Sequence, residues 1–179
     1  GASPAIPPIE GSDRDNVYSP GEILTGQAEL EGKRVIVVGS GMTGLETAQF
    51  LAEKGNYVSV YEMLDEIGPG VYFQNLIDII SHLDKFDVNM VTGHKLVKII
   101  DGQAIFEKTK TKEKVSIAAD AVVLSLGVKP NNELVDELKE NFRNVKVVGD
   151  AKEPRKIGQA IKEGFEEAYK LEVKELTTV

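Results

Sequence analysis

The chain has 179 residues, of which 41% are hydrophobic, and its 29 acidic against 21 basic side chains give a net charge of -8. This length and composition suit one globular domain of ordinary size, and the acidic balance without a long basic cluster argues against nucleic acid as a partner. The chain has no cysteine, so it cannot itself ligate an iron-sulfur cluster or form a redox-active disulfide.

Residues 1–23 are rich in proline, glycine, serine and aspartate. Proline fixes φ and removes a backbone donor, so we expect this segment to run extended and to act as a linker. The apolar run from Arg34 to Val38 then predicts the first buried strand.

That strand leads directly into Gly39-Ser40-Gly41-Met42-Thr43-Gly44, a G-x-G-x-x-G pattern, and then into a helical pattern of apolar residues. In such a motif the first glycine makes the tight turn, the second lets the backbone approach a pyrophosphate, and the third lets the helix pack closely on the strand. The start of the helix offers free N–H groups and a positive dipole end to the phosphates. The pattern therefore predicts a dinucleotide site.

The next elements support this prediction. The helical pattern stops at Gly55, which we expect to cap it, and a second strand from Tyr57 to Tyr61 ends in the carboxylate Glu62. Glu62 follows Gly39 by 23 residues, close to the separation of about 20 for the acidic residue that binds the adenosine ribose. The alternative is a glycine-rich turn in an ordinary α/β domain, with Glu62 merely solvated.

Glu62 also bears on the choice of cofactor. A carboxylate accepts hydrogen bonds from a free ribose 2′-hydroxyl but repels a 2′-phosphate at the same place. Residues 63–70 contain no lysine or arginine. We therefore expect NAD(H) to be favoured over NADP(H).

Apolar spacing predicts a second helix within Val71 to Leu83 and a third short strand from Val88 to Val91. Beyond it the period changes to two, since Leu96 to Ile100 and Gln103 to Glu107 flank Asp101-Gly102. That dipeptide suits a type I′ hairpin, in which both central residues need positive φ.

A third run, Val115 to Ile117, completes a predicted three-stranded antiparallel meander, where a plain doubly wound fold would have a helix. The buried parallel strand Ala121 to Leu126 follows and ends at Gly127. The tail then predicts a short helix from Asn131 to Glu140, a strand from Val145 to Val148, and a long amphipathic helix. The apolar positions of that helix are Ile157, Ala160, Ile161, Phe165, Ala168 and Leu171.

The sequence contains no pattern typical of a membrane span, a signal peptide or a metal site. The longest apolar runs are far below the roughly 18 residues of a membrane-spanning helix, and no signal-peptide pattern opens the chain. We therefore expect a cytoplasmic protein with no membrane partner. His82 and His94 stand in no metal-ligand spacing, so we expect both on the surface and no metal.

These residues resemble the NAD(P)-binding domain of two-dinucleotide flavoproteins, the superfamily that includes the pyridine nucleotide-disulfide oxidoreductases. The resemblance rests on G-x-G-x-x-G-x-E at Gly39 to Glu46, the acidic strand end at Glu62, the meander, and the crossover Leu124 to Asn131. It implies an α/β fold of the FAD/NAD(P)-binding Rossmann-like type with three layers. In that fold a parallel sheet has helices on one side and a three-stranded antiparallel meander on the other.

More narrowly, Gly149 to Ile157 followed by Ala160 to Phe165 is similar to the C-terminal region of old-yellow-enzyme-like NADH:flavin oxidoreductases, the group of the 2-enoate and dienoyl-CoA reductases. This resemblance implies electron flow from NADH to FAD, an iron-sulfur centre and FMN, held by other parts of a parent enzyme. Only one glycine motif occurs, so we expect FAD to bind only together with a further domain. Residues 1–23 and 129–179 would then flank an NAD(P)-binding domain, residues 24–128, as pieces of an FAD domain.

The resemblance also implies roles for single residues. The backbone N–H groups around Ser40 to Thr43 would bind pyrophosphate, and Glu46 would lie near the nicotinamide unless it is only a solvated carboxylate on the helix. Gly127 would let the crossover approach the cofactor, unless it simply ends a strand. Asp150 would meet the flavin ribityl chain, or else cap a turn. No catalytic side chain is expected, because the cofactors carry the hydride chemistry.

We therefore predict an NADH-binding domain that positions NADH for hydride transfer to FAD held largely by an absent domain, with the isolated chain inactive alone. The alternatives are the NAD domain of a disulfide or ferredoxin reductase, or a non-catalytic NADH-binding module. The apolar face of the tail helix must pack on the NAD domain or on a second copy, as in a homodimer.

Overall fold

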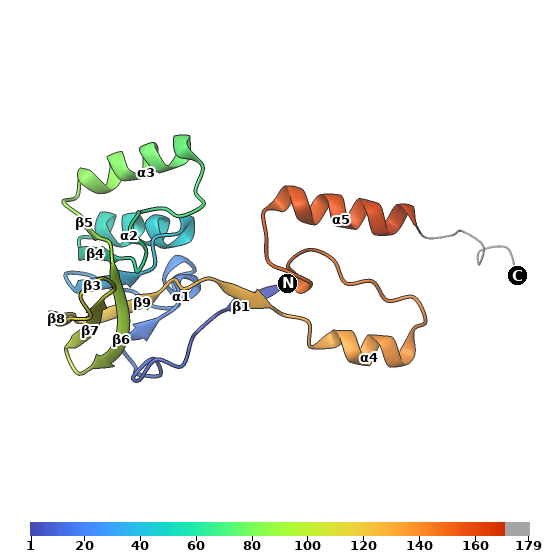
Figure 1. Cartoon of the computed structure of the whole chain (residues 1–179), viewed down its shortest axis with the longest axis horizontal. Helices are drawn as coiled ribbons and strands as arrows, with labels where there is room; N and C mark the ends of the chain where they lie inside the picture. Colours follow the sequence, from blue (N-terminus) through green and yellow to red (C-terminus); the bar gives the residue numbers. More distant parts are fainter. Residues whose placement is uncertain (171–179) are drawn as a thin grey trace, which may run out of the picture. The chain divides into compact units, whose positions relative to one another are not determined.

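The computed structural model describes residues 1–170. Two compact units are present: a larger one, residues 6–126, and a smaller one formed by residues 1–5 together with the chain from Gly127 onward (Figure 1). Within the described residues no helix is both long enough and apolar enough to cross a membrane.

The larger unit contains a five-stranded parallel sheet in the order β2-β9-β3-β4-β5. Its strands are β2 (Val17–Tyr18), β9 (Ala121–Leu124), β3 (Arg34–Val38), β4 (Tyr57–Tyr61) and β5 (Asn89–Val91). The chain moves outward from β3 through β4 to β5, and later returns to the other side of β3 as β9. The strand order therefore reverses beside β3, which is where open parallel sheets bind ligands.

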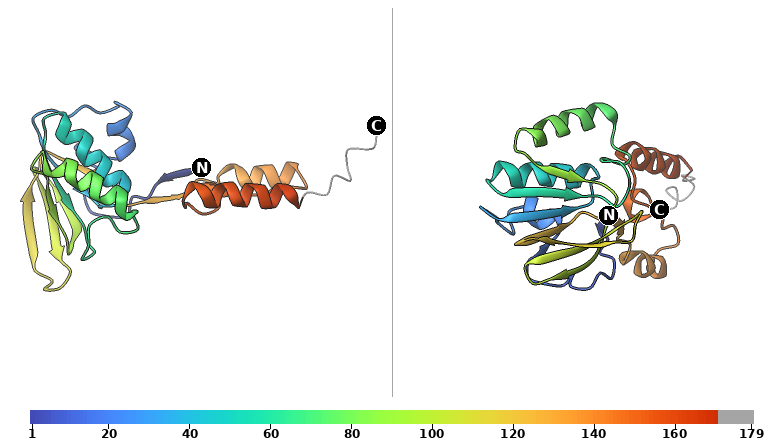
Figure 2. Two further views of the ribbon diagram at one scale, coloured as in Figure 1. Left: turned by 90° about the horizontal axis from the view of Figure 1, so that it is seen from above. Right: turned by 60° about the vertical axis from the view of Figure 1, so that its left-hand side comes forward.

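Three helices and a second sheet cover the two faces of the parallel sheet. The helices are α1 (Pro20–Leu24), α2 (Met42–Glu53) and α3 (Phe73–Asp84). The second sheet is an antiparallel meander of β6 (His94–Ile100), β7 (Gln103–Lys108) and β8 (Lys114–Ala118). Figure 2 shows the meander on the face opposite α2 and α3, which confirms the predicted three-layer fold.

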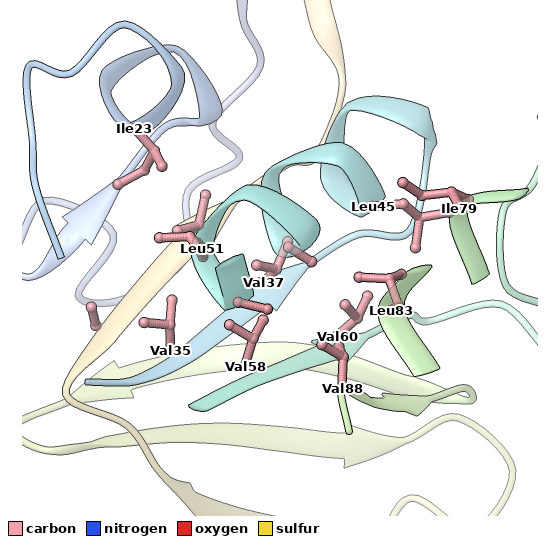
Figure 3. Packing of buried hydrophobic residues seen from close by; sticks show 14 residues of the cluster. Ile23, Val35, Val37, Leu45, Leu51, Val58, Val60, Ile79, Leu83 and Val88 are labelled. Atoms are coloured by element: carbon pink, nitrogen blue, oxygen red, sulfur yellow. The ribbon is translucent and has the colours of Figure 1, made fainter. Parts of the chain in front are cut away.

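The side-chain alternation of β3 explains these layers. Val35 and Val37 pack in the cluster with Leu45 and Leu51 of α2, as Figure 3 shows, whereas Ile36 and Val38 belong to the cluster under the meander. A strand buried on both faces reads as a continuous apolar run, as the sequence of β3 does.

Helix α2 ends close to the predicted place. Its C-terminal cap is Lys54, and Gly55 follows with φ +80°. Positive φ is favourable for glycine and strained for other residues, so Gly55 ends the helix as the sequence indicated.

The expectation that residues 1–23 form an extended linker was wrong for its second half. Val17 and Tyr18 pair with β9 as an edge strand, and a capping box then starts α1. Ser19 Oγ accepts from the N–H of Glu22 at 3.3 Å, and the Glu22 carboxylate accepts from the N–H of Ser19 at 2.7 Å. The burial of Ile23 provides the packing that holds this short helix in place.

The hairpin at Asp101-Gly102 is confirmed, since Ile100 pairs with Gln103 across it. Its predicted type was wrong. Gly102 has φ +67°, whereas Asp101 is not among the residues with positive φ. A type I′ turn needs positive φ at both positions, and here the aspartate keeps the sterically easier backbone.

The smaller unit pairs β1 (Ala2–Pro4) with β10 (Val128–Pro130) and continues with α4 (Leu134–Asn141), the 3₁₀ turn η1 (Gly149–Ala151) and α5 (Ile157–Tyr169). The strand predicted at Val145 to Val148 was wrong, because these residues have no strand assignment and pair with no strand among residues 1–170. A strand needs a neighbour for its backbone groups. The predicted tail helix is confirmed up to Tyr169, and Leu171 lies outside the described residues.

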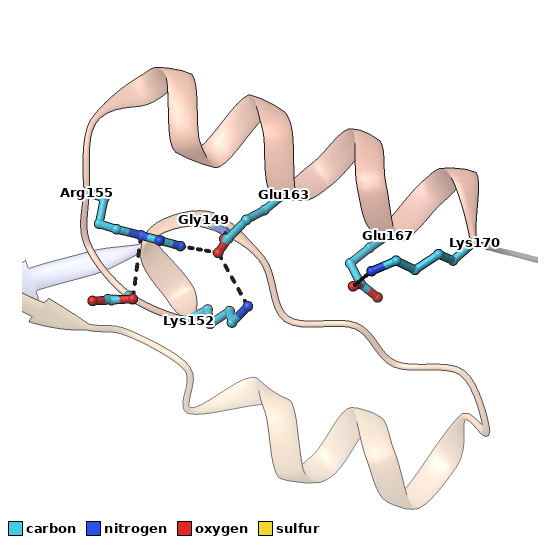
Figure 4. A network of polar contacts seen from close by, with 7 residues as sticks. Gly149, Lys152, Arg155, Glu163, Glu167 and Lys170 are labelled. Carbon is cyan, nitrogen blue, oxygen red and sulfur yellow. Dashed lines mark hydrogen bonds and ion pairs between the residues drawn. The ribbon is translucent and has the colours of Figure 1, made fainter.

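One carboxylate joins α5 to the turn before it, as Figure 4 shows. Glu163 accepts from the N–H of Gly149 at 2.9 Å and from Lys152 Nζ at 3.3 Å, and it also pairs with the guanidinium of Arg155. These donors, with the Gly149 N–H first, lower the pKa of Glu163. The same contacts order η1 against α5.

Candidate functional site

The turn between β3 and α2 cannot accept a side chain at two of its three glycines. Gly39 has φ +99°, and a Cβ there would lie 2.2 Å from the carbonyl oxygen of Ser125. A Cβ on Gly44 would lie 2.1 Å from the carbonyl oxygen of Gly39 and 3.1 Å from Ser125 Oγ. These glycines bring β3, α2 and the end of β9 within contact distance.

Gly41 is different, because a Cβ there would meet no atom within 4 Å and its φ is -61°. It is the N-cap of α2 and makes no side-chain capping bond. The first helical hydrogen bond runs from the N–H of Leu45 to the carbonyl of Gly41 at 3.1 Å, so the preceding amides, including those of Met42 and Thr43, have no partner within the helix. A helix N-terminus that faces open space is suited to bind an anion.

Glu62 lies immediately after β4 and is buried, with 6% of its surface exposed. Its Oε2 accepts from both the N–H and the hydroxyl of Ser40 at 2.9 Å, and its Oε1 accepts from the N–H of Leu64 at 3.0 Å. The alternative of a merely solvated Glu62 was therefore wrong. A carboxylate offers about four acceptor sites, so it can hold the glycine turn and still accept from a ligand hydroxyl.

Ser40 has a structural part in this arrangement that its place in the motif did not indicate. Its side chain is buried, it donates to Glu62, and its Oγ accepts from the N–H of Gly68 at 3.1 Å. The hydroxyl thus links the glycine turn to the segment after β4. Because the Ser40 N–H already donates to Glu62, the amides that remain for an anion begin at Gly41.

A cavity of about 410 Å³ connects these elements. It lies at the carboxyl ends of β3, β4 and β9, where Val38, Tyr61 and Ser125 line it. Of the predicted site residues, the cavity brings together Gly39, Gly41 and Glu62. Its position agrees with the rule that ligands bind outside the carboxyl ends of parallel strands where the strand order reverses.

His94 was expected on the surface, but it is half-buried and lines the same cavity. Its ring makes an edge contact with Tyr61, with centroids 5.8 Å apart. No motif in the sequence indicated this, because His94 reaches the cavity from the start of β6. His82 remains a partly exposed residue of α3.

The other predicted residues lie elsewhere. Glu46 is exposed on α2 and does not line the cavity. Gly127, with φ +92°, and Asp150 of η1 belong to the smaller unit, and Asp150 Oδ1 accepts from the N–H of Arg155 at 3.4 Å. Among the residues that the structure describes, no cluster of histidine and acidic side chains could hold a metal ion.

Known proteins resemble this chain over most of its length. Residues 1–157 match the family model described as pyridine nucleotide-disulphide oxidoreductase. The chain is 37% identical over 92% of its length to a bilirubin reductase of Mediterraneibacter gnavus, and 31% identical over 96% to an NADH oxidase of Thermoanaerobacter brockii. It spans 25% and 27% of these two relatives.

A solved structure agrees with this similarity. A 2-naphthoyl-CoA reductase complex superimposes with a TM-score of 0.85 at 27% identity, covering 96% of this chain and 26% of that one. A thioredoxin reductase of T. acidophilum, 16% identical with a TM-score of 0.72, shares the fold.

Proposed function

Because the chain belongs to the pyridine nucleotide-disulphide oxidoreductase family, whose members use FAD and a pyridine nucleotide, we propose that it is the NADH-binding domain of a flavin-dependent oxidoreductase. The observation that carries the proposal is the glycine turn. Gly39 and Gly44 have no room for a side chain, whereas the space beside Gly41 is open at a helix N-terminus. These are the features that a bound pyrophosphate requires.

In this proposal the amides from Gly41 to Thr43 bind the pyrophosphate and Glu62 accepts from the adenosine ribose. Bound NADH supplies the hydride, and this chain orients it and excludes water, so no side chain acts as acid or base. We further propose that Glu46 lies near the nicotinamide and that Gly127 gives the crossover room to approach it.

The preference for NADH over NADPH rests on Glu62. Its buried carboxylate is fixed by three hydrogen bonds, so it cannot move away from a 2′-phosphate without breaking the turn. Lys95 of β6 also lines the cavity, but it is exposed to solvent. Exposed cations contribute little, so we expect the carboxylate to decide the preference.

We propose that the parent enzyme is of the old-yellow-enzyme-like NADH:flavin type, with FAD, iron-sulfur and FMN parts outside this chain. The similarity to an NADH oxidase, of which the chain spans about a quarter, supports this proposal. So does the likeness to a 2-naphthoyl-CoA reductase. The smaller unit, to which residues 1–5 and the chain from Gly127 belong, would then be part of an FAD domain, and Asp150 would meet the flavin there.

Calorimetric titration of the chain with NADH and with NADPH tests the proposal. We expect NADH to bind several-fold more tightly, and Glu62→Gln to weaken NADH binding. Glu66→Gln, which changes an exposed carboxylate of the same segment, is the matched control. It should change neither the affinity for NADH nor the preference over NADPH. A preference for NADPH would overturn the interpretation of Glu62, and no binding of either nucleotide would overturn the domain assignment.

A further inference from the structure

The imidazole of His94 is held in one orientation at the wall of the cavity. Its backbone N–H donates to the carbonyl of Glu62 at 2.8 Å, which fixes β6 beside the end of β4. The ring meets Tyr61 edge to face at 76°, and Tyr61 itself stacks on Phe106 with centroids 4.4 Å apart. Phe106 and Tyr61 are buried, so this support is rigid.

The hydrogen bond of His94 also fixes its tautomer. Nδ1 lies 2.6 Å from the carbonyl oxygen of Thr92. A carbonyl only accepts, so Nδ1 carries the proton, and Nε2 of the neutral ring is left as an acceptor. This cavity-lining residue therefore carries a hydrogen-bond acceptor, and the Thr92 contact fixes which ring nitrogen it is.

The position of His94 matches one end of a dinucleotide. With pyrophosphate at Gly41 and ribose at Glu62, the base of a bound adenosine half would extend from the ribose away from the pyrophosphate. The residues that line the cavity together with Glu62 and His94 include the apolar side chains of Met63, Leu64, Pro69 and Leu96. Apolar walls with one directed polar group are the usual surroundings of a bound purine ring.

We propose that His94 reads the purine at position 6, with Nε2 accepting a hydrogen bond from the exocyclic amino group of adenine. This inference rests on the proposed NADH-binding function and adds the residue that selects the base. The amino group of adenine donates, whereas the carbonyl at position 6 of hypoxanthine accepts and would leave two acceptors facing each other. A site built to receive a donor discriminates against an analogue that lacks it.

The test compares NADH with reduced nicotinamide hypoxanthine dinucleotide, which differs from NADH at the purine alone. Both are titrated into the 179-residue chain under the same conditions, and binding is followed by calorimetry. We expect the wild-type chain to bind NADH roughly three- to tenfold more tightly, the factor that one neutral hydrogen bond provides. In His94→Phe, which keeps the ring contact with Tyr61 but has no acceptor, the ratio should fall to near one.

Two further variants make the result specific. His82→Ala removes the other histidine, on α3 outside the cavity, and should leave both affinities and their ratio unchanged. His94→Gln keeps a side chain that can accept or donate, so it should bind both nucleotides with a reduced ratio, and it replaces His94→Phe if circular dichroism shows that variant unfolded.

Three outcomes separate the proposals. If His94→Phe weakens the binding of both nucleotides equally, so that the ratio of the two affinities stays as in the wild-type chain, His94 is a structural residue and the inference is overturned. Equal affinity of the wild-type chain for NADH and for the hypoxanthine analogue would overturn it as well. If the wild-type chain binds neither nucleotide, the proposed NADH function itself fails.

Discussion

The three glycines of the turn after β3 have separate physical tasks. Gly39 and Gly44 create contacts within the protein, since a Cβ at either would lie within 2.2 Å of a carbonyl oxygen. Gly41 has a φ that any residue can adopt and no protein neighbour at its missing Cβ. The structure needs Gly39 and Gly44 for folding, and the proposed ligand needs Gly41.

Gly41→Ala is therefore expected to leave folding unchanged and to weaken NADH binding. The added methyl group meets no protein atom, so the free energy of unfolding should change by no more than about 0.5 kcal/mol, as for a neutral surface substitution. The same methyl group occupies the space proposed for the pyrophosphate, so NADH affinity should fall at least about tenfold, or 1.4 kcal/mol. Calorimetry and a thermal melt on one preparation check both.

Gly44→Ala is the matched comparison in the same motif. Its Cβ overlaps the carbonyl of Gly39, so we expect a loss of about 1–3 kcal/mol in unfolding free energy, as overpacking typically costs. If Gly41→Ala instead proved as destabilising as Gly44→Ala, or bound NADH normally, the open space beside Gly41 would not be a phosphate site.

Much of the candidate site could be predicted from local sequence at this scale. The glycine turn and Glu62 follow from spacing along the chain, because their geometry is set by one strand-turn-helix-strand unit. His94 could not be found in that way. It reaches the cavity only because the meander folds back onto β4, a contact between segments that no short pattern encodes.

At the scale of elements, strands that local sequence determines were predicted, whereas strands that depend on pairing with a distant segment were not. The runs of β3, β4 and β9 are apolar enough to indicate buried strands by themselves. The two-residue β2 was missed because its identity as a strand depends on pairing with β9. Val145 to Val148 carries a strand pattern without a neighbour in the described part of the chain, so the pattern alone was insufficient.

Strands β3 and β9 are also joined at their amino ends by an ion pair, whose contribution to stability depends on pH. Asp120 precedes β9 and accepts from the backbone N–H of Arg34 at 2.8 Å and from its guanidinium at 2.6 and 3.1 Å. The Arg34 side chain, and then its N–H, lower the pKa of Asp120 from 3.8 to about 2. A pKa lowered by folding stabilises the folded state above the unfolded value, and this stabilisation is lost as pH falls through the folded value.

We therefore expect the Asp120 contribution to be complete above about pH 4 and to disappear towards pH 2. Urea unfolding measured at intervals across this window should show a smaller loss of stability in Asp120→Asn than in the wild-type chain. Glu66→Gln, which changes an exposed carboxylate after β4, serves as the control. If the free energy of unfolding falls with pH equally in wild type and Asp120→Asn, the Arg34–Asp120 pair does not contribute to stability.

At the scale of the whole molecule, the larger unit has the buried clusters, and within residues 1–170 neither cluster includes a residue of the smaller unit. Its helix α5 has no buried residue, and Ile157, Ile161 and Phe165 stand at helical spacing with 79%, 66% and 68% of their surfaces exposed. Contiguous exposed apolar residues of this kind mark an interaction surface. In the proposed parent enzyme, the remainder of the FAD domain would cover it.

For the chain by itself we predict concentration-dependent self-association through this apolar face of α5, because burial of apolar surface is favourable by roughly 25 cal/mol per Å². Light scattering coupled to size exclusion should show a mass above 19.5 kDa that rises with concentration. Phe165→Glu places a charge in the middle of the face and should return the chain to the monomer mass. Ile77→Glu, at an apolar position of α3 that is 54% exposed, is the control that should not. A wild-type chain that stays monomeric at every concentration would contradict the prediction, and α5 would then need no second copy to remain soluble.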